Sequence, residues 1–536
     1  MRAKHWGVLA VAVATLMWSW GQAVGATVSK AAATVHERPP APADFVPATV
    51  RPEAVPANAR GVVNLASAGW QQEVNPDFGL PDGERWAGDI VVTTFSYDQV
   101  EPSMERAPDG SLFLAVEEHG EYDGWIRIWR SVDDGKHWDW MVGFKDAGGS
   151  RNPALTVAQN AAGQDYVYVA YHAPGRNAVG VYKAPTSGGF GTFLDVATGL
   201  TATDVYPRIC TDNSLWQTYY IYVTWTDNYI DYYPALFSRS LDYGATWSVV
   251  MNLTGGSESS SWVTQPDIAF GTAGLFVAFE KPGWSGSEWH SEIWVTRSTN
   301  FGSSWSTPVQ VSSGSLPAYE PAVAAAVGEN AVLVAYTRTY STDTDIHYAY
   351  STDSGTNWSM NHSLPWTWDN EKAVDVAAST AAGGRFHAAY WRAYDVEYTS
   401  ATVAAPDSWS PTVLVNEANW ASSAYPQPTV CVDERKLPKF EAAVAWTDYR
   451  GSYYQAYFDA MYLDCVGDVN CDGQIDFVDI NAFVLYLSNQ AAWLATYPSC
   501  PPENGDIDGN GTYPAFTDIN PFVTLLTTHS LPMLCP

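Results

Sequence analysis

Basic residues are scarce in this chain. Lysine and arginine number 27 against 58 aspartates and glutamates, which gives a formal net charge of −31, although charged residues of all kinds make up only 16% of the sequence. A surface this acidic repels nucleic acid and anionic lipid and attracts cations. The charge therefore argues against nucleic acid as a partner. Long apolar runs are also lacking: no segment after residue 26 is long and apolar enough to span a bilayer.

The first 26 residues have the pattern of a secretory signal. Arg2 and Lys4 precede the apolar run WGVLAVAVATLMW, and AVGA closes it with small residues, which predicts cleavage near Ala26. A retained membrane anchor is the alternative, but it needs about 20 apolar residues, and this core is shorter. We therefore expect a secreted protein. Residues 27–60 are rich in alanine and proline, lack strand or helix periodicity, and are predicted to be a linker.

Two landmarks recur along residues 61–464 at intervals of about 55 residues. One is a proline, or Val374 in one copy, that opens a short apolar run. The other is an alanine or threonine near the end of an alternating strand, as in VAYHA, VTWTD and VAYTR. Both landmarks divide the segment into seven units. The prolines are Pro102, Pro153, Pro207, Pro266, Pro321 and Pro428.

Seven units of this length, each a small antiparallel sheet, predict a mainly β fold, a seven-bladed β-propeller. The last unit lacks a fourth strand before Cys465. The segment IVVTTFSY at 90–97 is expected to supply that strand and to close the ring without an exposed edge. A solenoid or a sandwich array is the alternative fold.

Nearly the same octet occurs in four units, as SVDDGKHW at 131, SLDYGATW at 240, STNFGSSW at 298 and STDSGTNW at 351. The pattern resembles the Asp-box, or BNR repeat, of sialidases and related propellers. We expect Asp133, Asp242 and Asp353, with Asn300 in the third copy, to accept turn amides. The glycines are expected to take positive φ and the tryptophans to pack on the blade. The octets are therefore predicted to build hairpins between third and fourth strands, on the face opposite the site, and not to perform chemistry.

In a propeller, the loops that enter the innermost strand and those that leave the second strand meet on one face. Carboxylates, histidines and arginines gathered there are suited to bind and cleave a polar sugar. The residues before the first strands include Glu101, Asn152, Tyr206, Gln265, Glu320 and Gln427. The residues after the second strands include Glu117, Glu118, His119, His172, Asp227, Glu280, Lys281, Arg338, Arg392, Asp448 and Arg450.

The residues at this face are compatible with two reactions on a polysaccharide, hydrolysis and lyase cleavage. Hydrolysis of a glycosidic bond needs two carboxylates roughly 5–10 Å apart, for which Glu101, Glu117 or Glu118 with Glu320 are the candidates. A lyase acting on an acidic polysaccharide needs a base such as His172 and arginines that neutralise the sugar carboxylate.

Arginines follow the second strand in three consecutive units. Arg338, Arg392 and Arg450, with Asp448, are the candidate substrate ligands, because three converging guanidinium groups would clamp a carboxylate. The alternative is that each is a solvated rim charge or pairs with a neighbour such as Asp395 or Asp448.

The sialidase resemblance implies an Arg-Ile-Pro motif in the first blade, whose arginine holds the substrate carboxylate, and a tyrosine nucleophile activated by a glutamate. This chain has Val100, Glu101 and Pro102 at that place, so the arginine is missing. Sialidases also have six blades, whereas the repeat here gives seven units. Strict sialidase activity is therefore not expected.

Residues 465–536 contain two acidic loops, each followed by an apolar helix pattern. GDVNCDGQIDFVDINAFVLYL at 467–487 fits a twelve-residue calcium loop, and GDIDGNGTYPAFTDINPFVTLL from 505 is a second copy with one extra residue. An acidic turn without metal is the alternative. The paired units resemble a type I dockerin, which implies bound Ca²⁺. The candidate ligands are Asp468, Asn470, Asp472, the Gln474 carbonyl, Asp476 and Asp479 in the first loop, and Asp506, Asp508, Asn510, Thr512 and Asp518 in the second.

The dockerin resemblance also implies a cohesin partner, which hydroxylated residues at loop positions 10 and 11 recognise. Phe477 and Val478 occupy these positions instead. This departure argues against ordinary cohesin binding and leaves another docking role open, with a cohesin-like or cell-surface partner as the candidate.

The cysteines divide into two sets. Four of the six lie in the small C-terminal module, which is expected to need calcium and disulfides for stability. We favour pairing of Cys471 with Cys500 and of Cys465 with Cys535, although sequence leaves the connectivity open. Cys210 and Cys431 occupy the same place in the propeller repeat and are expected to be buried thiols.

Dockerins usually accompany polysaccharide-degrading domains. We therefore expect a secreted, carbohydrate-directed protein, a glycoside hydrolase or another polysaccharide-degrading enzyme. A non-catalytic glycan-binding or surface-attachment propeller is the alternative, and a protein-interaction scaffold a third. The binding alternative predicts exposed tryptophans, for which the candidates are Trp284, Trp289, Trp366 and Trp368.

Overall fold

The structure is a computed structural model. It describes residues 86–534 except 87, 94, 120–123, 147, 161, 190, 203–204, 213–218, 228–233, 255–264, 286–287, 313, 315, 342, 366, 368, 380–383, 434–439, 463–465, 473, 498–499, 501, 508–512 and 529–532. The predicted signal and linker, Trp366, Trp368, Cys465, Cys535, Asp508, Asn510 and Thr512 therefore lie outside the described residues.

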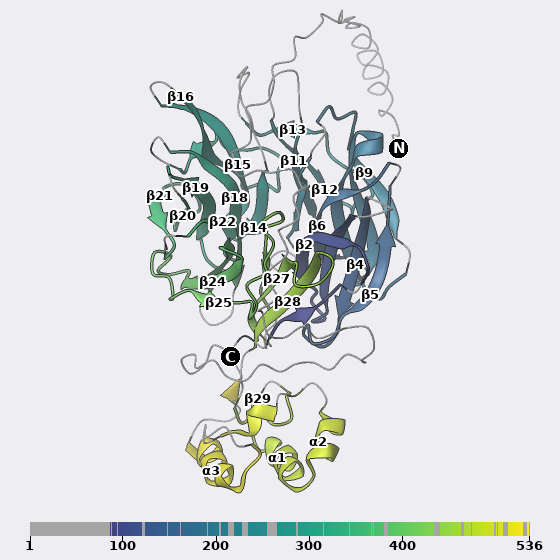
Figure 1. The fold of residues 1–536 in the computed structure, drawn as a ribbon, viewed down its shortest axis with the longest axis vertical. Coiled ribbons are helices and arrows are strands. Elements are labelled where there is room, and N and C mark those ends of the chain that lie inside the picture. Colours follow the sequence, from purple (N-terminus) through teal and green to yellow (C-terminus); the bar gives the residue numbers. More distant parts are fainter. Residues whose placement is uncertain are drawn as a thin grey trace, which may run out of the picture. The chain divides into compact units, whose positions relative to one another are not determined.

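Seven four-stranded antiparallel sheets follow one another along the chain (Figure 1). In the first six, consecutive strands are neighbours, and the first strand lies innermost. Blade 1 comprises β2 (Asp98–Arg106), β3 (Leu112–His119), β4 (Trp125–Ser131) and β5 (Asp139–Phe144); blade 2, β6 (Arg151–Gln159), β7 (Asp165–Ala173), β8 (Ala178–Pro185) and β9 (Thr192–Thr198), with a 3₁₀ turn at Pro174–Arg176; and blade 3, β10 (Arg208–Thr211), β11 (Ile221–Thr226), β12 (Ala235–Ser240) and β13 (Met251–Asn252).

The next three blades repeat this plan. Blade 4 comprises β14 (Asp267–Gly271), β15 (Gly274–Ser285), β16 (Glu288–Ser298) and β17 (Val309–Gln310); blade 5, β18 (Ala318–Ala325), β19 (Val332–Thr339), β20 (Thr344–Ser351) and β21 (Ser359–Ser363); and blade 6, β22 (Glu371–Ser379), β23 (Arg385–Arg392), β24 (Asp395–Thr402) and β25 (Val413–Leu414). The predicted propeller is therefore confirmed.

The seventh blade closes the ring with a strand from the start of the propeller. It consists of β26 (Thr429–Cys431), β27 (Phe440–Asp448), β28 (Gln455–Tyr462) and, outermost, β1 (Ile90–Val91), which pairs through Ile90 with Phe458 and through Val91 with Tyr457. The closure expected from residues 90–97 is confirmed, but only Ile90 and Val91 form strand. A solenoid or sandwich array is excluded.

The hydrophobic core lies between blades. Seven buried clusters each combine side chains from two adjacent blades, and together they pass once round the ring. The second strand of each blade is covered on both faces, which explains why β3 and β19 each begin with five apolar residues and have only their last residue partly exposed. Because apolar burial of this kind drives folding, each blade depends on both neighbours for its stability.

The four octets form the turns between third and fourth strands, as predicted. In the first, Gly135 N–H donates to Ser131 Oγ at 2.9 Å and His137 N–H to Asp133 Oδ1 at 2.9 Å, and the equivalent bonds recur in the other three. The glycines have φ between +74° and +94°. The tryptophans do not pack on their own blade alone. The ring centroids of Trp138 and Phe458, in blade 7, lie 5.2 Å apart. The octet therefore also packs against the preceding blade.

The described residues between 466 and 534 form a small α-helical module. Its elements are β29 (Gln474–Ile475), α1 (Asp479–Ser488), α2 (Gln490–Thr496), 3₁₀ turns at Pro502–Gly505 and Phe516–Asp518, α3 (Ile519–Thr528) and β30 (Met533–Leu534), which pairs with β29. Phe483 and Phe522 pack at 4.8 Å in its core. The predicted Cys471–Cys500 disulfide is present, and both helices expected after the acidic loops are confirmed. Among the described residues, no helix has the length and apolarity needed to cross a membrane.

Candidate active site

A cavity of about 680 Å³ lies on the propeller axis, and the innermost strands of all seven blades line it. One residue per blade, immediately before or within the start of the first strand, contributes to its wall. These residues are Glu101, Asn152, Tyr206, Gln265, Glu320, Ala373 and Gln427. The structure thus brings together all six residues that the repeat nominated ahead of the first strands.

The backbone at this ring is strained. Glu101, Asn152, Gln265 and Glu320 each precede a proline, yet have φ between +46° and +54°, and Ala373 has φ +55°. Positive φ is uncommon for a non-glycine residue and costs about 1–3 kcal/mol. The register of the first two strands shifts at four of these places. A bulge of this kind redirects a side chain, which here enters the cavity wall.

Side chains from the preceding blade hold the strained residues in place. Glu117 Oε2 accepts the Asn152 N–H at 2.8 Å, Glu280 Oε1 accepts the Glu320 N–H at 2.9 Å, and Thr337 Oγ1 accepts the Ala373 N–H at 3.1 Å. All three acceptors lie in the second strand of their blade. Because a buried N–H must find an acceptor, these repeated hydrogen bonds fix the ring residues relative to the neighbouring blade.

A hydrogen-bonded chain of three side chains lies beside Glu101. Glu117 Oε1 lies 2.7 Å from His119 Nε2, and Tyr425 Oη lies 3.2 Å from His119 Nδ1. Glu117 is 3% exposed and does not line the cavity. Of the predicted catalytic carboxylates, Glu117 therefore supports the site and Glu101 faces the cavity.

Glu101 carries the strongest electrostatic signal of the ring. Burial raises its pKa to about 7, the negative charge of Glu117 adds to the rise, and the charges of His119, Arg208 and Arg151 oppose it. A carboxyl group with a pKa near the working pH is suited to donate a proton.

Glu320 stands nearly opposite, in blade 5. Burial raises its pKa as well, and the positive charge of Lys372 and a hydrogen bond from Thr337 Oγ1 at 3.4 Å oppose the rise. These two partners favour the ionised form. The cavity wall therefore holds one carboxyl group suited to remain protonated and a second with partners that stabilise its charge.

The cavity wall beyond the ring residues is also acidic. Arg208 Nε lies 4.0 Å from Asp267. Burial raises the pKa of Asp375 to about 7, and the negative charge of Asp267 adds to the rise. Arg106 is paired with Asp433 at 3.4 Å. The wall holds six carboxyl groups and two arginines, so the cavity favours neutral over anionic ligands.

The two propeller cysteines also line the cavity. Cys210 and Cys431 are free, and burial raises the pKa of both thiols well above the usual value. Cys431 is buried, as expected, whereas Cys210 retains partial exposure. Protonated thiols are weak nucleophiles, which assigns them to the wall and not to the chemistry.

The other predicted propeller residues lie elsewhere. Arg450 is paired with Asp448 at 2.7 Å, as the alternative interpretation expected, and Arg392 with Glu397 at 2.6 Å. Arg338 and His172 are buried, 5% and 1% exposed. Among the described residues that line the cavity, none of these predicted ligands is present.

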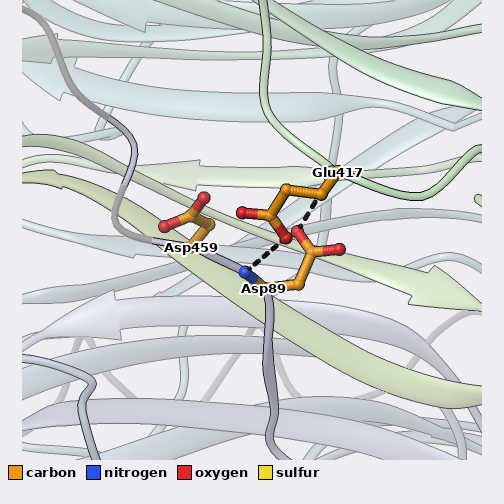
Figure 2. Close-up of side chains that lie close together, drawn as sticks. All are labelled: Asp89, Glu417 and Asp459. Atoms are coloured by element: carbon orange, nitrogen blue, oxygen red, sulfur yellow. Dashed lines mark hydrogen bonds between the residues drawn. The ribbon is translucent and has the colours of Figure 1, made fainter. Parts of the chain in front are cut away.

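Sequence reasoning missed an acidic cluster at the ring closure (Figure 2). Asp89 N–H donates to Glu417 at 2.9 Å, Glu417 N–H donates to Asp89 at 3.3 Å, and Gly88 N–H donates to Asp459 at 3.1 Å. Burial raises the pKa of Asp89 to about 7 and that of Asp459 well above its usual value. One oxygen of each carboxylate lies within 4.8 Å of the others, close enough for a single cation. Arg450, 2.5 Å from Asp89, already supplies a positive charge.

The first acidic loop of the C-terminal module offers oxygen donors of the kind Ca²⁺ prefers. Asp468 and Asp479 are fully buried at its two ends. Asp479 accepts the N–H groups of Asn470 at 3.1 Å and Asp476 at 2.9 Å, and Asp468 accepts that of Asp472 at 3.2 Å. The loop carboxylates are not gathered as closely as the closure cluster. The donor set and chain path fit a calcium loop, in which Asp468, Asn470, Asp472 and Asp479 would hold the ion.

The second loop is described in part. Asp506 begins it, and Asp518, fully buried, accepts the Ala515 N–H at 2.9 Å. This bond is equivalent to the one from Asp476 to Asp479 in the first loop.

No family model and no curated protein matches the chain. Among solved structures, the propeller is similar to an α-L-arabinanase of Penicillium chrysogenum complexed with arabinobiose (12% identity, 70% of this chain, 98% of that chain, TM-score 0.46). It is also similar to a protein of unknown function from Dyadobacter fermentans (14%, 72%, 100%, 0.45) and to an ulvan lyase bound to a disaccharide unit (12%, 70%, 96%, 0.48). Identities and TM-scores this low do not assign a function.

Proposed function

We propose that the protein is a secreted glycoside hydrolase that cleaves a neutral polysaccharide at the axial cavity. The observation that carries the proposal is the pair Glu101 and Glu320 in the wall of one cavity, the first with a pKa of about 7. Glycosidases use a protonated and an ionised carboxyl group on either side of the scissile bond. Glu101 donates the proton to the leaving oxygen as the glycosidic bond breaks. Glu320, ionised, either attacks the anomeric carbon, to form an ester that water then hydrolyses, or takes the proton from a water that attacks this carbon.

The charge of the cavity favours hydrolysis over lyase chemistry. A lyase must neutralise the carboxylate of an acidic sugar, and the cavity arginines Arg106 and Arg208 already face Asp433 and Asp267. His172, the candidate lyase base, is buried away from the cavity lining. A neutral sugar meets no such obstacle.

The test is sugar release from neutral and acidic polysaccharides by the wild type and by Glu101→Gln, Glu320→Gln and Glu371→Gln. Glu371 is the matched control, because burial also raises its pKa to about 7 but it does not line the cavity. Loss of either proton-transfer group is expected to lower kcat by about 10²- to 10⁴-fold, whereas Glu371→Gln retains activity. Equal effects of all three substitutions, or preferential cleavage of acidic polymers, would overturn the proposal.

A second candidate is a non-catalytic glycan-binding propeller. The side chain of Trp284, which is 56% exposed in the long second strand of blade 4, favours it. Polymer binding without sugar release by the wild type would select this function.

The C-terminal module is proposed to bind Ca²⁺ and to dock the enzyme onto a partner. Its loop donors support the first role. The exposed apolar residues Phe477, Val478 and Phe516 (61%, 57% and 80% exposed) support docking, to a cohesin-like or cell-surface protein, through an apolar contact.

A further inference from the structure

The hairpin of β15 and β16 in blade 4 has longer strands than any other hairpin of the described propeller. β15 and β16 have 12 and 11 residues, and the ladder between them runs unbroken from Leu275 with Ser298 to Ser285 with Glu288. Figure 1 shows this pair reaching past the neighbouring strands of blade 5. A continuous ladder makes the hairpin a stiff arm.

The arm rises on the face where the innermost strands start, which carries Glu101 and its equivalents in the other blades. Asp267, the first residue of β14, pairs with Ala278 of β15. The strands are antiparallel, so everything after Ala278 extends beyond the start of the innermost strand, where Gln265 lines the cavity. The hydrogen bond from Glu320 N–H to Glu280 ties the same strand to the backbone of Glu320, which bears one of the proposed active-site carboxylates. Ser291 Oγ of β16 donates to Glu280 Oε2 at 3.0 Å.

Trp284 lies near the tip of this arm. It is 56% exposed, among the most exposed aromatic side chains of the described propeller. It lies four positions after Glu280, which corresponds to about 14 Å along a strand. Only a chain of several sugar residues spans that distance from the cavity. A flat aromatic face with an N–H at its edge suits a sugar ring, which has an apolar face and polar edges.

We propose that Trp284 forms an outer subsite that binds a sugar unit of a polysaccharide whose scissile bond lies between Glu101 and Glu320. This inference rests on the proposed hydrolase function and names its substrate class. The enzyme acts on extended neutral chains and prefers them to short oligosaccharides, because only a long chain reaches both places.

The test compares the wild type with Trp284→Ala, Trp284→Phe and Trp140→Ala. Trp140, 51% exposed on the outermost strand of blade 1, is the matched control. The probes are neutral polymers (arabinan, xylan, galactan and β-glucan) and their short oligomers. For each variant, kcat/KM is measured on polymer and on dimer, and unchanged melting temperatures establish intact folding.

The ratio of kcat/KM on polymer to that on dimer is expected to fall about tenfold in Trp284→Ala, to recover partly in Trp284→Phe, and to stay constant in Trp140→Ala. Equal ratios in Trp284→Ala and the wild type overturn the subsite.

Retardation in gels containing each polymer separates this inference from the proposed function. If the wild type cleaves nothing but is retarded, and Trp284→Ala alone loses retardation, the subsite holds and the hydrolase function fails. A wild type that neither cleaves nor is retarded overturns both.

Discussion

At the scale of single residues, the site depends on where a side chain is placed more than on its type. Glu101 and Glu118 are both glutamates of blade 1, the first in β2 and the second near the end of β3. Glu101 occupies a strained bulge in the cavity wall, whereas Glu118 is held by Arg127 at 2.9 Å and 3.1 Å. Only the first has the environment of a general acid, with a pKa of about 7.

The pKa of Glu101 predicts the pH dependence of activity. The acid form is needed for proton donation, so kcat/KM is expected to fall as the pH rises through about 7. Because the charge of Glu117 raises this pKa, Glu117→Gln moves the fall to lower pH. Profiles of kcat/KM against pH check this, with Glu118→Gln, which leaves the fall in place, as the control. A fall at the same pH in both variants would mean that Glu117 does not act on Glu101.

The ring residues were predictable because each precedes a repeat landmark, such as Pro102 within β2 or Pro321 within β18. Tyr425 was not, because it lies in the segment between β25 and β26 that the repeat does not cover. Its approach to His119 joins residues 306 positions apart. The positive φ of Glu101 was equally hidden, since a residue before proline is expected to be extended.

At the scale of elements, the octets explain how blades adhere. Their glycines are needed for two reasons: the backbone has positive φ, and a Cβ atom would collide with a neighbouring side chain. A Cβ on Gly135 would lie 2.2 Å from Phe458 of the preceding blade, whereas one on Gly163, at φ +75°, would meet nothing within 4 Å.

This difference predicts unequal costs for two similar substitutions. Gly163→Ala is expected to cost about 1–2 kcal/mol for the left-handed backbone alone. Gly135→Ala adds overpacking of about 1–3 kcal/mol. Denaturant unfolding of both variants measures the difference. Equal destabilisation would contradict the interblade role of the octet.

The first acidic loop of the C-terminal module is a second element whose role can be tested, through its binding of Ca²⁺. Isothermal titration of the full chain with Ca²⁺ is expected to show binding that Asp468→Asn weakens more than about tenfold, since even outer-shell changes weaken metal sites by about 10- to 100-fold. Asp407→Asn, an exposed propeller substitution, is the control. Heat signals that do not differ among the three proteins would refute the site.

At the scale of the whole molecule, ring closure brings together side chains that are far apart in the sequence. Asp89, Glu417 and Asp459 meet only because β1 returns to blade 7 (Figure 2). The repeat period predicted the number of blades and the closing strand. It could not predict this cluster, whose members lie outside the repeated positions and far apart in the chain, Asp89 and Glu417 being 328 positions from each other.

The axial cavity is the other product of closure, and the functional account depends on it. The most direct measurement is a crystal structure of Glu101→Gln with an oligosaccharide from a polymer that the wild type cleaves. The account predicts the sugar in the axial cavity, with a glycosidic oxygen within hydrogen-bonding distance of the residue 101 side chain and Glu320 across the bond. Sugar bound on another face, with the cavity free of it, would contradict the account.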